Sequence, residues 1–307
     1  MLSVFRTNPL SLLALFGIFN LGVSASPLWE RDASTGFGTI TTVTNGSVVR
    51  ATINNPPVNL ADPKLITDLN SFLKSLTAPN APKVVIFDSS NPGWFIGHLD
   101  LNLIKPVNPN PNAAQILGLY RESVGLLGSL PVIFIGQVSG RALGAGNELL
   151  IHFDMRFAGP GTNLGALEVA LGLTQGTGGV QYLTKLIGPA RAAEYLLSNG
   201  DVDAKTAAAI GWVNTAYEST SELRQAVDAL AHRIATFPLG ALNATKAGIN
   251  ENKPTDQSVA DDVARFGTLL GTPEEVTAVN KFLAFSNNQS ANAFELGLNE
   301  DLVALYP

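Results

Sequence analysis

The amino-acid sequence predicts an α/β protein in which a region of mixed strands and helices precedes a helical region. Between residues 37 and 188, short segments rich in Val and Ile alternate with segments whose apolar residues recur at helical spacing. From about Gly188 onward the pattern becomes almost entirely helical. The chain has 307 residues, of which 46% are hydrophobic and only 14% are charged, and this composition suits a packed globular core.

The first predicted elements are a β-hairpin and a helix. Residues 37–43 and 47–53 are rich in Ile, Val and Thr, and Asn45-Gly46 between them is a favoured turn pair. Asp62 and Pro63 then supply an N-cap and a first-turn proline for a helix with one apolar face. The fold is therefore expected to begin at this hairpin.

Further elements follow in an alternating order. Residues 83–87 and 132–138 are apolar runs typical of buried strands, and a helix is predicted at about residues 113–129 between them. Beyond residue 188 the predicted segments are all helical: 189–198, 203–210, 221–236, 239–249, 256–270, 276–285 and 291–298.

The N-terminal segment, residues 1–25, has the pattern of a secretory signal peptide. Arg6 precedes an apolar run over residues 10–23, and Val23-Ser24-Ala25 offers small residues for cleavage. The run contains Asn20 and is shorter than the roughly 20 apolar residues that span a bilayer. We expect a secreted or secretory-pathway protein; an uncleaved anchor and a mitochondrial or other intracellular site are the alternatives. Three glycosylation triplets are compatible with secretion, at Asn45, Asn243 and Asn288.

Composition and motifs exclude several classes of function. The formal net charge of −6 provides no basic footprint for nucleic acid, which we do not expect as a partner. The chain has no cysteine, so it lacks disulfides, thiolate nucleophiles and Cys-based zinc sites. It has no Gly-Lys-Ser/Thr phosphate loop and no Gly-x-Ser-x-Gly elbow. His98, His152 and His232 show no ligand spacing, so no metal is expected.

Two glutamates follow or accompany glycine-rich turns. Glu148 comes just after Gly144-Ala145-Gly146, and Glu168 precedes a stretch that contains Gly176; helix-compatible apolar runs follow both. Such turns let the backbone approach a ligand and direct first-turn N–H groups at negative charge. A carboxylate among apolar neighbours is either paired or functional. The alternative is a solvated helix-terminal residue favoured by the helix dipole.

Several motifs in this order resemble the enoyl-CoA hydratase/isomerase, or crotonase, superfamily. The resemblance covers roughly residues 38–250, and its motifs are residues 83–87 with 95–100, 131–148, 168–183 and Gly211-Trp212-Val213. It implies a spiral of strand-strand-helix repeats, which we place at residues 37–235. It also implies a C-terminal helical oligomerisation region at residues 236–307 that builds a homotrimer or a hexamer.

The resemblance also implies site residues. In the family, two backbone N–H groups bind the thioester oxygen of an acyl-CoA, and Leu99 and Ala145 occupy those positions. Hydratases of the family use two glutamates around a water, and these correspond to Glu148 and Glu168. We expect four further residues to contact the substrate: His98, Asp100, Gly144 and Gly176. The resemblance implies no metal or redox cofactor, with the acyl-CoA acting as the substrate.

The sequence departs from the family pattern at several positions. His98 stands where glycine is usual, Ala145 where glycine is common, and Leu167 where proline is common. Gln175 precedes Gly176 where proline is usual. Basic residues that would contact CoA are few, because residues 54–59 contain no Lys or Arg and Asn102 stands where lysine is frequent.

The leading hypothesis is therefore an enoyl-CoA hydratase that adds water to a 2-enoyl-CoA. One glutamate would deprotonate the water that attacks C3 and the other would protonate C2. The first alternative is a 3-enoyl-CoA isomerase, since one glutamate suffices to move a proton. The second is a non-catalytic secreted protein that keeps the fold for binding, because CoA thioesters are intracellular metabolites.

Overall fold

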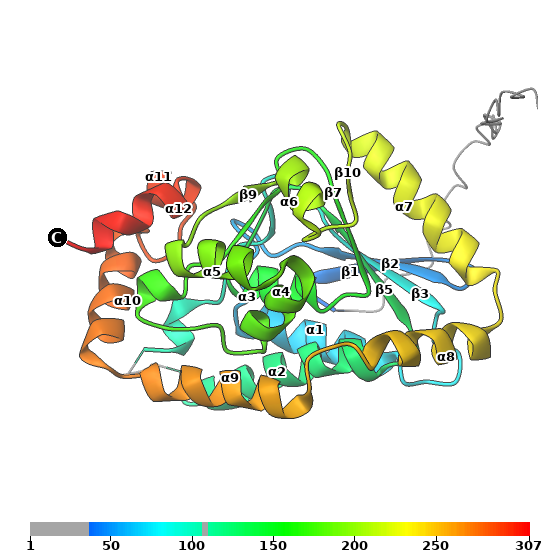
Figure 1. The fold of residues 1–307 in the computed structure, drawn as a ribbon, viewed down its shortest axis with the longest axis horizontal. Coiled ribbons are helices and arrows are strands. Elements are labelled where there is room, and N and C mark those ends of the chain that lie inside the picture. The colour runs from blue at the N-terminus through cyan, green and yellow to red at the C-terminus, as the bar shows by residue number, and fades with distance from the viewer. Residues whose placement is uncertain (1–36, 106–109) are drawn as a thin grey trace, which may run out of the picture.

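The computed structural model describes residues 37–105 and 110–307 (Figure 1). The predicted signal peptide at residues 1–25 lies outside the described residues. Within the described part of the chain, none of the helices combines the length and apolar character needed to cross a membrane.

The strands form two sheets. Strands of the six-stranded sheet lie in the order β1-β2-β3-β5-β7-β10. They are β1 (Ile40–Asn45), β2 (Val48–Ile53), β3 (Val84–Ser89), β5 (Ile133–Val138), β7 (Met155–Ala158) and β10 (Thr215–Ala216). The four-stranded sheet has the order β4-β6-β8-β9. Its members are β4 (Trp94–Ile96), β6 (Arg141–Leu143), β8 (Asn163–Gly165) and β9 (Val202–Asp203).

Successive turns of the chain add one strand to each sheet. β3 leads into β4, β5 into β6, and β7 into β8, and the strands of consecutive turns pair in parallel. A parallel pair needs a long crossover, and helices provide it here. The helices after the three turns are α2 (Ala113–Ser129), α3 (Ala145–Ile151) and α4 (Gly179–Ile187). The structure therefore confirms the predicted spiral of strand-strand-helix repeats.

The structure confirms the predicted opening elements. β1 and β2 pair antiparallel, but Asn45 pairs with Val48, so the turn residues are Gly46 and Ser47 rather than Asn45 and Gly46. Helix α1 (Pro63–Ser75) begins after Asp62, whose carboxylate oxygen accepts a hydrogen bond from the Leu65 N–H at 2.8 Å. The N-cap and first-turn proline thus act as predicted.

The C-terminal half is largely helical, as predicted. Its helices are α5 (Pro189–Ser198), α6 (Ala204–Ile210), α7 (Thr220–Ala235), α8 (Leu239–Asn250), α9 (Asp256–Leu269), α10 (Pro273–Phe285), α11 (Ala293–Leu296) and α12 (Leu298–Asp301). The expectation that strands end before residue 188 is wrong, because β9 and β10 follow it. Each has two residues, too few to produce a periodic pattern, and each is defined by pairing with an earlier strand.

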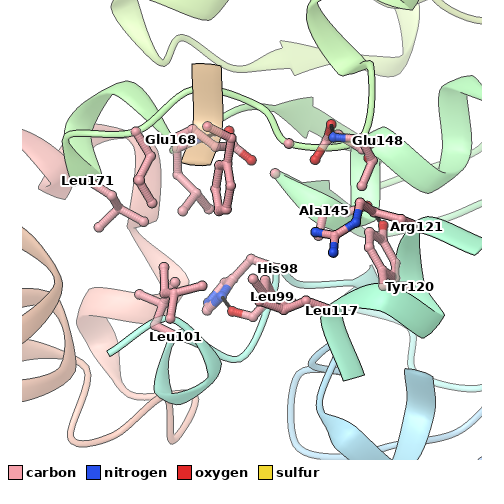
Figure 2. Close-up of a pocket in the computed structure, with 17 residues that line it drawn as sticks. His98, Leu99, Leu101, Leu117, Tyr120, Arg121, Ala145, Glu148, Glu168 and Leu171 are labelled. Atoms are coloured by element: carbon pink, nitrogen blue, oxygen red, sulfur yellow. Dashed lines mark hydrogen bonds between the residues drawn. The ribbon is translucent and has the colours of Figure 1, made fainter. Parts of the chain in front are cut away.

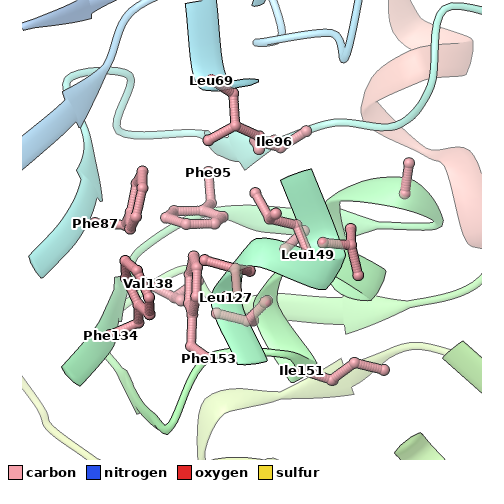
Figure 3. Close-up of a cluster of buried hydrophobic side chains, with 14 of the residues drawn as sticks. Leu69, Phe87, Phe95, Ile96, Leu127, Phe134, Val138, Leu149, Ile151 and Phe153 are labelled. Atoms are coloured by element: carbon pink, nitrogen blue, oxygen red, sulfur yellow. The ribbon is translucent and has the colours of Figure 1, made fainter. Parts of the chain in front are cut away.

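Aromatic rings fill the main core between the sheets and the helices (Figure 3). The rings of Phe87 and Phe153 stack with centroids 5.1 Å apart, and Phe95 meets Phe153 edge-on at 6.5 Å. Aromatic pairs of this kind contribute about 1 kcal/mol beyond their buried area. Phe95 lies in β4, so this packing anchors the strand that leads into the segment containing His98 and Leu99.

The first turn of α3 packs directly on β4. A Cβ atom on Gly146 would lie 2.2 Å from the carbonyl oxygen of Ile96, a distance that real Cβ atoms do not adopt. Only glycine permits this approach. The contact brings the start of α3 beside the segment that follows β4, although they are separated by about 50 residues in the chain.

We predict that Gly146→Ala lowers the free energy of unfolding by about 3 kcal/mol, because the new methyl group must displace the backbone of β4. The matched control is Gly248→Ala on α8, where a Cβ atom would meet nothing within 4 Å. This control is expected to raise stability by up to about 1 kcal/mol through helix propensity. Denaturant unfolding of both variants checks the prediction, which an unchanged midpoint for Gly146→Ala would contradict.

Candidate active site

A cavity of about 50 Å³ lies where α2, the segment after β4, the first turn of α3 and the segment after β8 converge. A water molecule needs roughly 10–15 Å³ of such volume, so the cavity has room for a few waters or a small reacting group. All the predicted site residues except Asp100 line it: His98, Leu99, Gly144, Ala145, Glu148, Glu168 and Gly176. Figure 2 shows the two glutamates across the cavity from His98 and Leu99.

The backbone N–H groups of Leu99 and Ala145 are available to a ligand. Neither donates a hydrogen bond to an acceptor within the described residues. Ala145 is the first residue of α3, where N–H groups have no partner within the helix. The N–H of Leu143 donates to the carbonyl oxygen of Gly97 at 3.1 Å and so ties together the two segments that carry these amides.

Gly144 shapes the turn before α3. Its φ of 49° lies in the left-handed region, and a Cβ atom there would lie 2.7 Å from Oε1 of Glu168. Glycine is therefore needed both for the backbone angle and for the space beside the carboxyl group. Its own N–H donates to the carbonyl oxygen of Gly165 at 3.0 Å, which leaves Ala145 as the next amide along the chain.

Glu148 lies in the first turn of α3 and is buried. Its Oε1 atom accepts hydrogen bonds from the backbone N–H groups of Thr177 at 2.8 Å and Gly179 at 3.1 Å. Burial, and then the charge of Glu168, raise the pKa of Glu148 from 4.5 to about 7, while the two amide bonds act in the opposite direction. Its carboxyl group therefore gains and loses a proton near neutral pH.

Glu168 is the second buried carboxyl group of the cavity. Its Oε2 atom accepts one backbone hydrogen bond, from the Leu167 N–H at 3.0 Å. Burial raises the pKa of Glu168, against the opposing effects of the Leu167 amide, the His98 charge and the Gln175 side chain. The apolar run after Glu168 forms only a 3₁₀ turn, η2 (Val169–Leu171), rather than the helix that its composition allowed.

His98 is fully buried and joins two distant parts of the chain. Its Nδ1 atom lies 2.8 Å from the Leu99 carbonyl oxygen and must be the donor, because a carbonyl only accepts. Its Nε2 atom lies 3.2 Å from Oε2 of Glu295. Burial lowers the pKa of His98, but the contacts with Glu295, the Leu99 carbonyl and Asp100 outweigh it, so the net pKa is raised. Glu295 lies on α11 and is itself fully buried.

Three leucines of the cavity pack against the C-terminal helices. Leu101, Leu167 and Leu171 share an apolar cluster with residues of α10 and α12 and of η3 (Leu302–Leu305). The buried cluster residues from these three elements are Val279, Phe282, Leu283, Leu298, Leu302 and Leu305. The His98–Glu295 pair thus sits where this cluster meets the segment that carries Leu99.

Asp100 does not line the cavity, contrary to the substrate contact expected from the sequence. Its Oδ1 atom accepts hydrogen bonds from the Asn102 N–H at 3.0 Å, the Asn102 side chain at 2.9 Å and the Gln289 side chain at 2.8 Å. These bonds cap the 3₁₀ turn η1 (Leu101–Leu103) and fasten it to the C-terminal region. The position therefore has a structural role, because its acceptor is directed at the protein.

Two polar cavity residues on α2 were not identified from the sequence. Tyr120 is buried and its hydroxyl donates to the carbonyl oxygen of Ala145. Burial and the charges of Glu148 and Glu168 raise the pKa of Tyr120 well above 10, so the phenol stays neutral and holds the Ala145 peptide in place. Arg121 lines the same cavity. Helical spacing indicates which face of α2 is buried, but not which distant turn that face meets.

Metal binding finds no support in the side-chain arrangement. Within residues 37–105 and 110–307, no three His, Asp or Glu side chains are grouped so that they could hold an ion. The expectation that the protein needs no metal or cofactor stays a prediction.

Taken together, the spiral fold and two buried carboxyl groups with raised pKa values, beside backbone amides that have no acceptor among the described residues, are typical of an acid–base enzyme. A family model described as enoyl-CoA hydratase/isomerase matches residues 43–269. The chain belongs to the enoyl-CoA hydratase/isomerase family and is an enzyme of the lyase or isomerase kind.

Individual relatives agree with this assignment. The crystal structure of a candidate enoyl-CoA hydratase from Streptomyces avermitilis superposes with a TM-score of 0.80 at 35% identity, covering 90% of this chain and 100% of that one. The crotonyl-CoA hydratase of Syntrophomonas wolfei is 27% identical over 234 residues, which is 75% of this chain and 89% of the relative. The short-chain-enoyl-CoA hydratase of Clostridium acetobutylicum is 26% identical over 249 residues, 78% and 92% of the two chains.

The raised pKa of Glu148 predicts that the folded state loses stability as the pH rises. Because the folded pKa of about 7 exceeds the ordinary 4.5, the folded state holds the proton more tightly, and this stabilisation is complete below about pH 4.5 and lost as the pH rises through 7. The difference corresponds to about 3 kcal/mol for this fully buried group.

Glu148→Gln removes this titration. The free energy of unfolding of the variant, minus that of the wild type, should therefore increase by about 3 kcal/mol between pH 4.5 and pH 8. Denaturant unfolding at a series of pH values measures it. Loss of the amide contacts affects both ends of the series equally, so parallel curves for the two proteins would sink the prediction.

The His98–Glu295 pair is expected to couple strongly. Glu295→Ala or His98→Ala alone should lower the free energy of unfolding by about 3–5 kcal/mol, since each leaves a buried partner unpaired. The double variant should cost at least 1 kcal/mol less than the sum. The control cycle uses Lys74 and Glu122, which are 2.8 Å apart and about half exposed, and should show much weaker coupling because solvent screens the two charges. Equal coupling energies in the two cycles would contradict this.

Proposed function

We propose that the protein is an enoyl-CoA hydratase that adds water across the C2–C3 double bond of a 2-enoyl-CoA thioester. Glu148 and Glu168 are the acid–base pair, and the backbone N–H groups of Leu99 and Ala145 bind the thioester oxygen. One observation carries the proposal. Both carboxyl groups line one small cavity together with the two residues whose backbone N–H groups have no acceptor among the described residues.

The amides would lower the barrier by stabilising charge. Attack of water at C3 moves electrons toward the thioester and builds enolate charge on its oxygen. Two preorganised N–H donors in an apolar cavity oppose that charge without reorganisation, and removal of one such donor typically costs about 100- to 1000-fold in rate. Tyr120 and the Gly97–Leu143 hydrogen bond support the proposal because they hold the two amides in fixed positions.

The two glutamates would share one proton at the start of the reaction. The charge of Glu168 helps to raise the pKa of Glu148, so ionisation of one carboxyl group favours the protonated form of the other. One glutamate would deprotonate the water that attacks C3, and the other would deliver its proton to C2. The proton balance closes, because the proton taken from water replaces the one given to carbon.

Coenzyme A recognition would differ from the basic contacts usual in the family. Asn102, which stands where lysine is frequent, directs its side chain to Asp100 at 2.9 Å and Asn288 at 3.1 Å. It is therefore committed to the protein and is a poor candidate for a phosphate contact. Assembly into a homotrimer or hexamer and entry into the secretory pathway remain proposals that rest on the resemblance and on residues 1–25.

Hydration of crotonyl-CoA tests the proposal directly. We expect loss of the absorbance of the conjugated thioester with the wild type, and a fall in kcat of about 100- to 10,000-fold for Glu148→Gln and for Glu168→Gln, the range for lost general acid–base catalysis. Glu194→Gln on the exposed face of α5 is the control and should keep full activity. Wild-type rates in the Glu148→Gln, Glu168→Gln double variant would refute the acid–base pair.

Product analysis separates the alternatives. A 3-enoyl-CoA substrate that is converted to the 2-enoyl isomer without hydration would assign an isomerase, since one glutamate suffices to move a proton. Binding of acyl-CoA without conversion of either substrate would indicate a protein that keeps the fold for binding alone.

A further inference from the structure

A second, larger chamber adjoins the active-site cavity. Its volume is about 480 Å³, it is partly open to solvent, and α2, the start of α4 and the segment from Asn250 through α9 line it. In Figure 1, α2 and α9 both lie along the lower edge of the molecule. The chamber shares Arg121 and Thr177 with the active-site cavity, so these two residues lie on the border between them.

At this border, Arg121 is a cation without a hydrogen-bond or ion-pair partner among the described residues. Arg121 is exposed on α2, and Figure 2 shows its guanidinium beside Ala145 and Tyr120. No hydrogen bond or ion pair joins it to any of the described residues. A guanidinium presents its donors in a planar fork that matches a carboxylate. The border between the cavity and the chamber therefore offers a guanidinium that is free to bind an anion.

A surplus of positive charge continues behind the chamber. Asp154 is 2.9 Å from Nζ of Lys246 and 3.7 Å from Nζ of Lys253, and it also balances the charge of Arg156. The single negative charge of Asp154 therefore lies among three positive charges. Lys253 lines the chamber, and its contact with Asp154 is too long for a hydrogen bond. Burial, and the neighbouring charges of Lys246 and Arg156, lower the pKa of Lys253, as expected for an ammonium short of anions.

The remaining chamber groups do not cancel this charge. Asp256 is the only carboxylate among the described lining residues, against Arg121 and Lys253. His152 adds no charge at neutral pH, because burial lowers its pKa to about 4. The active-site cavity itself has room for little beyond the reacting part of an acyl group, so a longer chain would pass Arg121 and Thr177 into the chamber.

We propose that this chamber is a subsite for a carboxylate at the far end of the acyl chain, with Arg121 as its principal ligand and Lys253 as a supporting charge. The preferred substrate is then a 2-enoyl-CoA whose acyl group is a dicarboxylic half-thioester rather than a plain fatty acyl group. The inference rests on the proposed hydratase function for its kinetic consequences, but the binding site itself does not depend on turnover.

Two five-carbon substrates form a matched pair, because glutaconyl-CoA ends in a carboxylate and 2-pentenoyl-CoA ends in a methyl group. We expect kcat/KM of the wild type to be roughly 10-fold or more higher for glutaconyl-CoA. Arg121→Gln should lower kcat/KM roughly 10- to 100-fold more for glutaconyl-CoA than for 2-pentenoyl-CoA, as for loss of a charged hydrogen bond. Lys253→Met should act in the same direction with a smaller effect. Arg191→Gln on α5, which lines neither cavity, is the control.

The phosphates of CoA are the competing source of negative charge. If Arg121 bound them, Arg121→Gln would weaken both substrates equally, and the loss would vanish with the corresponding pantetheine thioesters, which lack the nucleotide. That outcome would overturn the carboxylate subsite. Persistence of the selective loss with the pantetheine thioesters supports it.

Calorimetry separates this inference from the proposed reaction. Glutaryl-CoA and valeryl-CoA are saturated and need no turnover, and the wild type should bind glutaryl-CoA at least about 10-fold more tightly, whereas Arg121→Gln should bind the two alike. Equal binding by the wild type overturns the subsite. Preference for glutaryl-CoA without hydration of either unsaturated substrate would refute the proposed reaction and leave the subsite standing.

Discussion

The close approach of α3 to β4 is the contact on which the rest of the site depends. Gly146 leaves no room for a side chain against the Ile96 carbonyl, and the Gly97–Leu143 hydrogen bond closes the same junction. The stacked aromatic core fixes β4 from behind. Because both amides sit within a few residues of this junction, their separation is set by backbone packing, which is the most rigid part of a folded protein.

Burial of Glu148 and Glu168 lowers the stability of the folded state at neutral pH. Two carboxyl groups that would be ionised and hydrated in the unfolded chain are buried in a small cavity, where each resists ionisation. Backbone amides offset part of this cost, and so does His98 beside Glu168. The same apolar surroundings that raise the pKa of these groups also strengthen the attraction between an amide donor and a developing oxyanion. The apolar surroundings of the cavity therefore account both for the loss of stability and for the stronger attraction to an oxyanion.

Elements with a strong local signal were predicted well. The Asp62-Pro63 start and the apolar face of α1 depend on residues within a few turns of each other, so the sequence reveals them. The short strands β4, β6 and β8 were missed as strands, because three residues show no alternation and each is stabilised by its neighbours in the sheet. The turn at Gly46-Ser47 was displaced by one residue, since strand pairing rather than the turn pair sets the register.

The sequence by itself determined the α/β spiral, the family resemblance and the candidates Glu148, Glu168, Leu99 and Ala145, because these lie in compact motifs. Only the tertiary structure decided which other groups meet them. Glu295 reaches His98 across 197 residues, the Tyr120 hydroxyl meets the Ala145 carbonyl, and Asp100 turns away from the cavity. Local periodicity assigns a residue to a buried face, but partners on that face are chosen by the folded path of the whole chain.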